Sequence, residues 1–219
     1  MGFDASCWQT NDPATALITS HLTLNLPSGG FPLLAANEYL ADDVNRFADL
    51  AAARHPVGLL SQATGGQPER SLRWREMLRP NGFDAELRVA FVDGAGCWGS
   101  LILVRDRGRS DFDSETVVAV QRLAATLVAG LRRTAVAQQT SIEPPAHGPG
   151  LVVLDRHGQM ESLTPAARHW LDHLGDDDPP VLSAVAASAH ASGPARARVR
   201  TPTGQWLILH GACLPQIPD

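Results

Sequence analysis

The sequence predicts an α+β fold built on antiparallel sheets. Stretches with apolar residues at every second position, typical of strands, flank stretches with helical spacing in both halves of the chain. Every connection between successive strands that is short enough to judge is a hairpin. Hairpins join antiparallel neighbours, because parallel strands need a crossover of roughly a dozen residues or more. We therefore expect antiparallel sheets flanked by helices.

A proline- and glycine-rich segment divides the chain. Residues 138–150 hold three prolines and two glycines between two patterned regions, which is linker chemistry. The sequence therefore predicts a larger first domain over residues 1–138, a linker over 139–150 and a smaller domain over 151–214.

The first domain opens with two strand-like stretches, 3–10 and 16–26, and the second alternates with period two from His21 to Leu26. A helix is expected from 33 to 53, because apolar residues there recur at three- and four-residue steps. The residue before a proline avoids helical geometry, so His55-Pro56 should end this helix. A ligand-facing loop over 62–71 and a short helix over 71–79 follow. We expect the arginines of this region to form the solvated face of that short helix: Arg70, Arg73, Arg75 and Arg79.

A hairpin and a long helix complete the first domain. Residues 85–92 and 98–104 read as two strands joined by the tight turn Asp93-Gly94-Ala95-Gly96. Asp113 is placed to cap a helix that runs to about residue 137. A helix of ~25 residues is ~37 Å long, more than a small domain needs to cover its sheet. We therefore expect a homodimer through the 113–137 helix.

The smaller domain is also expected to combine strands, turns and helices. Strands are expected over 151–155 and 159–163, with the turn Arg156-His157-Gly158 between them. Thr164-Pro165 supplies an N-cap and a first-turn proline for a helix over 166–174. A loop over 176–180, a helix over 181–191 and a final hairpin of residues 195–200 and 205–213 follow.

Length and composition limit the class of protein. The chain has 219 residues, of which 44% are hydrophobic and 19% charged, so it can bury a sizeable core. No apolar run approaches the ~18 residues that span a bilayer, so we expect no membrane contact. Basic residues, all arginine, number 18 against 23 acidic ones, and the net charge of −5 argues against a nucleic-acid surface within the chain.

Cysteine usage points to the cytoplasm. Cys7, Cys97 and Cys213 are odd in number and far apart, and they lack CxxC spacing. We expect buried small hydrophobic side chains in a cytoplasmic protein.

Residues 94–99 match the glycine pattern GxGxxG literally. The dinucleotide-binding version of this pattern needs a helix directly after the glycines, where the pyrophosphate is received. A β-rich apolar run, Ser100 to Val104, follows instead. We therefore assign these glycines to the hairpin turn.

No other catalytic or metal-binding motif stands out. His169 and His173 have zinc-compatible spacing on a helix, but the sequence offers no obvious third ligand, so we expect no metal and no cofactor. The aromatic residues of the first domain either pack the core or line a ligand cavity with nearby polar groups. The candidate pocket residues are Trp8, Phe47, His55, Ser61, Trp74, Phe91 and Trp98.

Two segments carry a family resemblance. Residues 97–105 (CWGSLILVR), with Asp111, Asp113, Glu115 and the long helix after them, resemble the closing hairpin and last helix of GAF domains. The opening FDASCW with DPAT at 12–15 looks like the GAF-type sensor region of actinobacterial LuxR-type transcriptional regulators. Residues 150–155 (GLVVLD), Gly158 and LTPAAR at 163–168 are similar to a small PAS domain.

The resemblance implies a sensory, non-enzymatic region of a transcriptional regulator. In such regulators a PAS-like module follows the GAF domain and precedes a helix-turn-helix, so DNA would be contacted only by a domain outside this chain. The input would be a small molecule of unknown identity or a partner, since these folds host many ligands. Two alternatives stay open: a ligand-free dimerisation scaffold, and a cysteine-dependent enzyme similar to free methionine sulfoxide reductases, in which Cys7 and Cys97 approach each other.

Overall fold

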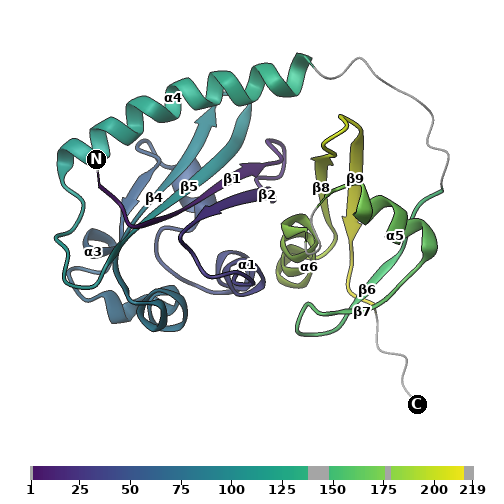
Figure 1. The fold of residues 1–219 in the computed structure, drawn as a ribbon, viewed down its shortest axis with the longest axis horizontal. Coiled ribbons are helices and arrows are strands. Elements are labelled where there is room, and N and C mark those ends of the chain that lie inside the picture. Colours follow the sequence, from purple (N-terminus) through teal and green to yellow (C-terminus); the bar gives the residue numbers. More distant parts are fainter. Residues whose placement is uncertain (1, 138–147, 176–178, 215–219) are drawn as a thin grey trace.

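We describe the protein from a computed structural model, which places residues 2–137, 148–175 and 179–214. Its core is a five-stranded antiparallel sheet in the order β2-β1-β5-β4-β3 (Figure 1). The sheet strands are β1 (Ala5–Asn11), β2 (Ile18–Leu24), β3 (Val57–Leu59), β4 (Phe83–Asp93) and β5 (Gly96–Asp106). The predicted α+β class with antiparallel sheets is confirmed.

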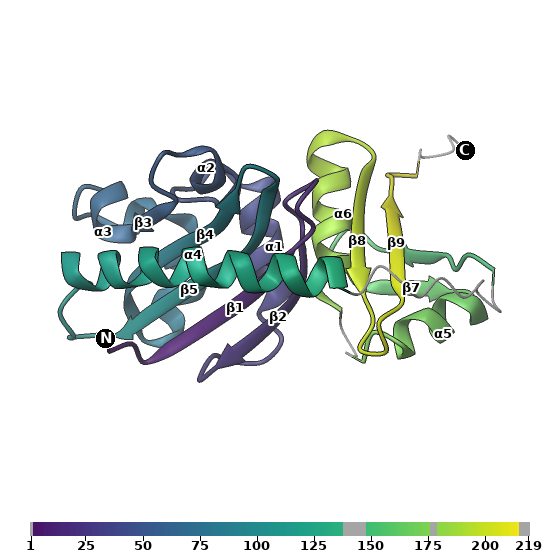
Figure 2. The same cartoon turned by 90° about the horizontal axis from the view of Figure 1, so that it is seen from above.

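The two faces of the sheet are covered differently. Helix α4 (Ser114–Ala137) lies across one face, as Figure 2 shows from above. The other face carries the shorter helical elements α1 (Phe31–Leu40), α2 (Phe47–Ala52) and η2 (Trp74–Leu78), a π-helical turn. The helical turns α3 (Leu60–Ala63), η1 (Pro68–Arg70) and η3 (Arg79–Asn81) complete this part of the chain.

Strand alternation assigns each side chain to one face. Successive residues of a strand point to opposite sides. In β4, Leu87, Val89 and Phe91 pack with the buried residues of α4. On the other face, Cys7 of β1 and Ile102 of β5 pack with α1.

Helix α4 matches the sequence prediction. The Asp113 carboxylate accepts a hydrogen bond of 2.7 Å from the backbone N–H of Thr116, which caps the first turn. All residues of its apolar stripe lie in the cluster against the sheet: Val117, Val120, Ala124, Leu127, Val128 and Leu131. The predicted hairpin is also confirmed, and the chain continues from Gly96 as strand β5 without a helix.

The predicted single helix over 33–53 is wrong, because the chain breaks between α1 and α2. Ala41 is extended and Asn45 adopts a left-handed φ of +56°. The cause is a buried carboxylate. Asp43 accepts hydrogen bonds from Asn37 Nδ2 and from the backbone N–H groups of Val44 and Arg73, which hold residues 41–46 outside helical geometry.

The interpretation of the arginine cluster is wrong for one member. Arg73 is only 1% exposed and lies inside the protein, whereas Arg70, Arg75 and Arg79 are exposed. Arg73 can be buried because Glu86 on β4 pairs with it. The sequence pattern around Arg73 does not reveal this partner, which comes from another element.

The C-terminal part holds two separate hairpins and two helices. Hairpin β6 (Val152–Leu154) with β7 (Met160–Leu163) precedes α5 (Pro165–Asp172), which Thr164 caps as predicted. Hairpin β8 (Ala195–Arg200) with β9 (Trp206–Gly211) follows α6 (Pro180–Ser192). Most of the predicted linker 139–150 and of the loop 176–180 lies outside the described residues, so the division into domains stays a prediction.

The C-terminal part packs directly against the first part. Helix α6 lies beside α1, and Ala184 of α6 belongs to the core cluster on the α1 face of the sheet (Figure 1). Leu17, just before β2, is buried among Val181, Val185 and Val199 of the C-terminal part. The two parts therefore share apolar side chains across their boundary.

Candidate functional site

A cavity of about 340 Å³ lies between the central sheet and the elements that cover its α1 face. This volume falls within the ~300–1,000 Å³ range of small-molecule sites. The residues that line it come from four strands, from α1, from the loop after β2 and from the η2 region: Cys7, His21, Thr23, Leu26, Pro27, Ser28, Gly29, Gly30, Phe31, Leu34, Arg73, Met77, Leu78, Asn81, Phe83, Glu86, Ile102 and Val104.

Strand register builds the floor of the cavity. Cys7 lies opposite Thr23 on β2 and opposite Ile102 on β5, so these three residues form one row across the sheet. Val104, two residues further along β5, lies opposite Glu86 of β4. Alternation sends this whole set to the α1 face.

The side of the cavity that faces the sheet is formed by α1 and η2 and is mostly apolar. Phe31 and Leu34 of α1 are buried, as is Leu78 of η2, while Met77 is half-buried. The loop 26–30 forms the exposed side of the cavity, and Gly29 there has a left-handed φ of +76°. Residues in π-helical turns such as η2 often occur at functional sites.

A closed ion pair forms the charged part of the wall. Arg73 Nε donates to Glu86 Oε1 at 2.9 Å, and Arg73 Nη2 donates to Glu86 Oε2 at 2.7 Å. Both side chains are 1% exposed. Such bidentate geometry is the strongest form of an arginine–carboxylate contact.

The same arginine holds together the loops behind the wall. Arg73 Nη1 donates to Asn37 Oδ1 at 3.0 Å, and Nη2 also donates to the carbonyl of Val44 at 3.2 Å. Asp43 lies 3.5 Å from Nη1. Burial alone would raise the pKa of Asp43, but its hydrogen bonds from Arg73 N and Asn37 and the Arg73 charge outweigh burial and lower that pKa.

A second buried pair lies further along β4. Arg88 Nη2 donates to Glu38 Oε2 at 2.7 Å, and its guanidinium carbon stacks 3.8 Å from the centre of the Phe47 ring. Burial, together with the neighbouring charge of Arg73, lowers the pKa of Arg88. Arg88 Nε and Nη1 have no hydrogen-bond partner in the structure.

His21 presents an unsatisfied polar atom at the cavity. Its Nδ1 is buried and has no hydrogen-bond partner. The imidazole stacks on the Phe31 ring with centroids 5.0 Å apart and planes 18° apart, which fixes the orientation of the ring. Because buried polar atoms in proteins are normally hydrogen-bonded, this nitrogen is available to bond a group of a ligand in the cavity.

The two cysteines of the first part are not brought together. Cys7 faces Ile102, and Cys97 lies five residues before Ile102 on β5, which corresponds to a separation of roughly 17 Å along the strand. Burial raises the pKa of each thiol to about 11. Both therefore stay protonated near neutral pH, the unreactive form of cysteine.

None of the seven sequence-predicted pocket residues lines this cavity, and the structure divides them between the two faces of the sheet. Trp8, Phe91 and Trp98 pack with α4, whereas Phe47 and Trp74 lie in the cluster on the α1 face. His55 is exposed, and Ser61 Oγ donates to Asp111 at the surface. That any single one of them contacts a ligand stays a prediction.

Two signals in the sequence could have located the cavity. Cys7 and Trp8 are neighbours on one strand and must face opposite sides of the sheet. Only one of them can therefore line a cavity on a given face. Glu86 and Arg88 alternate with apolar residues in a strand that reads as central. Charges at such positions are almost never buried without a partner.

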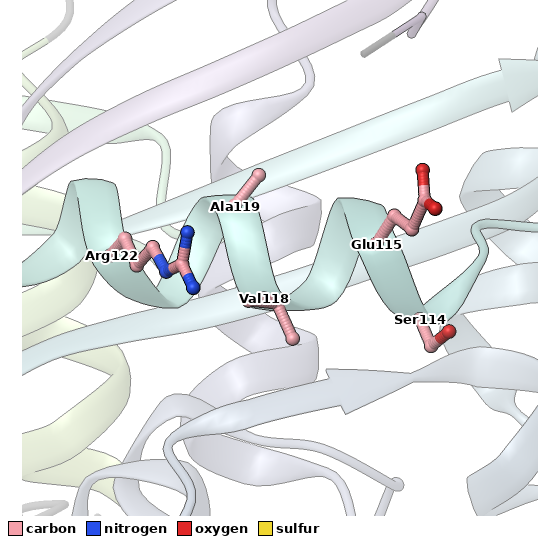
Figure 3. Close-up of a pocket in the computed structure, with 5 residues that line it drawn as sticks. All are labelled: Ser114, Glu115, Val118, Ala119 and Arg122. Carbon is pink, nitrogen blue, oxygen red and sulfur yellow. The ribbon is translucent and has the colours of Figure 1, made fainter.

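A shallow depression lies on the outer surface of α4. Figure 3 shows its residues, and all of them belong to that one helix: Ser114, Glu115, Val118, Ala119 and Arg122. A ligand here would stay largely in water, because no second element closes over it. The surface is better suited to contact with another protein surface than to a small molecule.

Within the described residues no group of three histidine, cysteine, aspartate or glutamate side chains is arranged to hold a metal ion. Among the helices placed by the structure, none combines the length and the apolar character needed to cross a bilayer.

Comparison with known proteins gives little. No family model matches the sequence, and no curated protein is significantly similar to it. Among solved structures, the chain is similar to the GAF domain of a two-component sensor histidine kinase from Bacillus halodurans, with 10% sequence identity and a TM-score of 0.42. That match covers 64% of this chain and 88% of the other. A likeness at this level says nothing about a ligand or an activity.

Proposed function

We propose that this chain is a small-molecule sensor of the GAF type. The observation that carries the proposal is the cavity between the central sheet and α1, which combines an apolar lining with a few fixed polar groups. The motif resemblance of residues 97–105 and of the long helix is consistent with this assignment. In this proposal the ligand is bound and not transformed. Two observations support that: burial raises the pKa of both thiols, which lie far apart, and the charged groups on the wall are paired with each other.

We further propose that ligand binding is relayed through α1. One side of this helix lines the cavity with Phe31 and Leu34, and the helix also packs against α6 of the C-terminal part. Tyr39 of α1 packs against the core cluster on the α1 face of the sheet and also against the cluster around Leu17. Its hydroxyl accepts a hydrogen bond of 3.0 Å from the backbone N–H of Ile18. A ligand that fits one position of α1 better than another would therefore bias the C-terminal part.

The regulatory context is proposed from the sequence resemblance alone. In regulators of the LuxR type, a helix-turn-helix domain contacts DNA, and the region described here would control it. The PAS-like assignment of residues 151–214 belongs to the same proposal. The net charge of −5 supports a role in which this region does not itself bind DNA.

The sensor proposal is tested by native mass spectrometry of the purified chain, with and without incubation in extracts of small metabolites. Two matched variants locate the bound mass. Thr23→Trp places a bulky ring at the cavity, whereas Leu22→Trp adds the same ring one residue away, on the opposite side of the strand. We expect the wild type and Leu22→Trp to retain an added mass that Thr23→Trp loses. A chain that retains no added mass under any condition would contradict the sensor proposal.

A homodimer through α4 is part of the proposal. The outer face of α4 leaves Val118 and Leu123 exposed at 43% and 38%. Sedimentation of the wild type should give the mass of two chains, and Val118→Asp should shift it toward one. A monomeric wild type at micromolar concentration would exclude this interface.

A further inference from the structure

The ligand class follows from the charges on the cavity wall, if the cavity is the sensor site proposed above. Of the lining residues in the part of the chain that the structure describes, Arg73 is the only arginine, and the sequence has no lysine. Its donors are committed to Glu86, to Asn37 and to the carbonyl of Val44. A ligand carboxylate or phosphate would find no free cation here.

The described lining of the cavity also offers no unpaired carboxylate to a cationic ligand. Among the described residues that line the cavity, Glu86 is the only carboxylate, and it is buried and bonded through both oxygens to Arg73. Taking one partner away from a buried ion pair leaves an uncompensated charge, which is strongly unfavourable. A charged ligand of either sign would therefore bring its own unpaired charge into the cavity.

The remaining lining is mostly apolar: its polar side chains Thr23, Ser28 and Asn81 are exposed to water, and one buried polar atom has no partner. The side chains that make up most of the surface are hydrocarbon or thioether: Leu26, Phe31, Leu34, Met77, Leu78, Phe83, Ile102 and Val104. Burial of apolar ligand area against them is favourable at roughly 25 cal/mol per Å². The buried polar atom is His21 Nδ1, which has no hydrogen-bond partner and lies beside Phe31.

We infer that the cavity takes an uncharged, largely apolar small molecule with one hydrogen-bonding group directed at His21. Because Arg73 and Glu86 are already paired with each other, neither a positive nor a negative charge on the ligand gains a partner from them. The apolar lining therefore supplies the affinity, and the unpaired imidazole nitrogen supplies the orientation.

The test compares two fluorescent probes on the full chain by titration. N-phenylnaphthylamine and anilinonaphthalene sulfonate share one ring framework and an N–H group, but only the second carries a charge. We expect saturable binding of one N-phenylnaphthylamine per chain. The sulfonate should bind at least about tenfold more weakly, because its charge must be buried without a partner.

Variants tie the binding to this cavity. Thr23→Trp should abolish binding of the uncharged probe, while Leu22→Trp, on the other side of the same strand, should leave it unchanged. His21→Phe keeps an aromatic ring beside Phe31 but removes the nitrogen, and should weaken binding about two- to tenfold. Thermal unfolding of each variant establishes that it is folded.

The outcomes separate the two proposals. Equal or tighter binding of the sulfonate at a Thr23-sensitive site overturns the ligand class and leaves the sensor proposal standing. Unchanged affinity in His21→Phe overturns the role of the imidazole nitrogen. Binding of neither probe, or binding that Leu22→Trp and Thr23→Trp reduce equally, overturns the ligand class and also removes the cavity that supports the sensor proposal.

Discussion

At the scale of single residues, the centre of the molecule is organised by Arg73. This one side chain joins η2 to β4 through Glu86, to α1 through Asn37 and to the loop before α2 through Val44. A buried guanidinium needs all of these acceptors, because an unpaired buried charge is far more costly than a paired one. The pair therefore fixes the wall of the cavity before any ligand enters.

Removing either partner of this pair should be severe. Arg73→Met or Glu86→Leu alone is expected to lower the free energy of unfolding by about 3–5 kcal/mol, because each leaves a buried charge uncompensated. The double variant should cost less than the sum of the two, by roughly 0.5–3 kcal/mol. Urea denaturation of the four proteins measures this, and strict additivity would show that the two side chains do not interact.

Asp43 predicts a dependence of stability on acid pH. Its pKa is lowered in the folded protein, so its contribution is fully present above the unfolded value of 3.8 and is lost as the pH falls through the lower folded value. We expect Asp43→Asn to be less stable than the wild type at pH 7. The two unfolding free energies should converge as the pH falls below about 4. A constant difference across this range would contradict the lowered pKa.

At the scale of elements, local signals were sufficient where the stabilising groups are close in sequence. The cap of α4 is three residues from the N–H that it satisfies, and the apolar stripe of α4 repeats within the helix itself. The break between α1 and α2 has the opposite origin. Asp43 holds the backbone open through contacts with Asn37 and with residues of the η2 region, Ser71 and Arg73.

The cap of α4 gives a graded prediction. Asp113→Ala should lower the free energy of unfolding by about 0.5–2 kcal/mol, because the Thr116 N–H loses its acceptor. Asp113→Ser, which restores a side-chain oxygen, should recover most of this loss. Hydrogen exchange at the first turn of α4 provides the second measurement. Equal stability of Asp113→Ala and the wild type would mean that the cap contributes nothing.

At the scale of the whole molecule, a charged contact reinforces the boundary between the two parts. Asp12, in the turn between β1 and β2, accepts hydrogen bonds from Arg198 of β8: from N at 2.7 Å, from Nη2 at 2.9 Å and from Nε at 3.2 Å. The Asp12 side chain is 2% exposed, whereas that of Arg198 is 43% exposed. This contact lies beside the apolar cluster around Leu17.

Arg198→Ala should therefore loosen the C-terminal part first. We expect a loss of about 1–2 kcal/mol, because Asp12 keeps only the backbone donors and the lost pair is partly exposed to water. Hydrogen exchange should rise at α6 and β8 before it rises in the central sheet. Arg196→Ala, an exposed position on the same strand, is the control. Equal effects of the two variants would show that the contact with Asp12 does not stabilise the boundary.

The sequence by itself determined most of the strands and helices, the hairpins and the antiparallel arrangement of the sheet. These features depend on alternation, turn residues and capping groups that are close together along the chain. None of the seven candidate pocket residues lines the cavity, and that any of them contacts a ligand stays a prediction.

Only the tertiary structure decided which side of the sheet holds the cavity, that Arg73 is buried and that Cys7 and Cys97 are apart. Each of these depends on partners distant in sequence. Glu86 of strand β4 meets Arg73 of the helical segment before η2, and the register of β1 with β5 sets Cys7 opposite Ile102 and away from Cys97. Burial of a charge is stable only when such a partner arrives, and the pattern of one segment carries no information about where the other segment will lie.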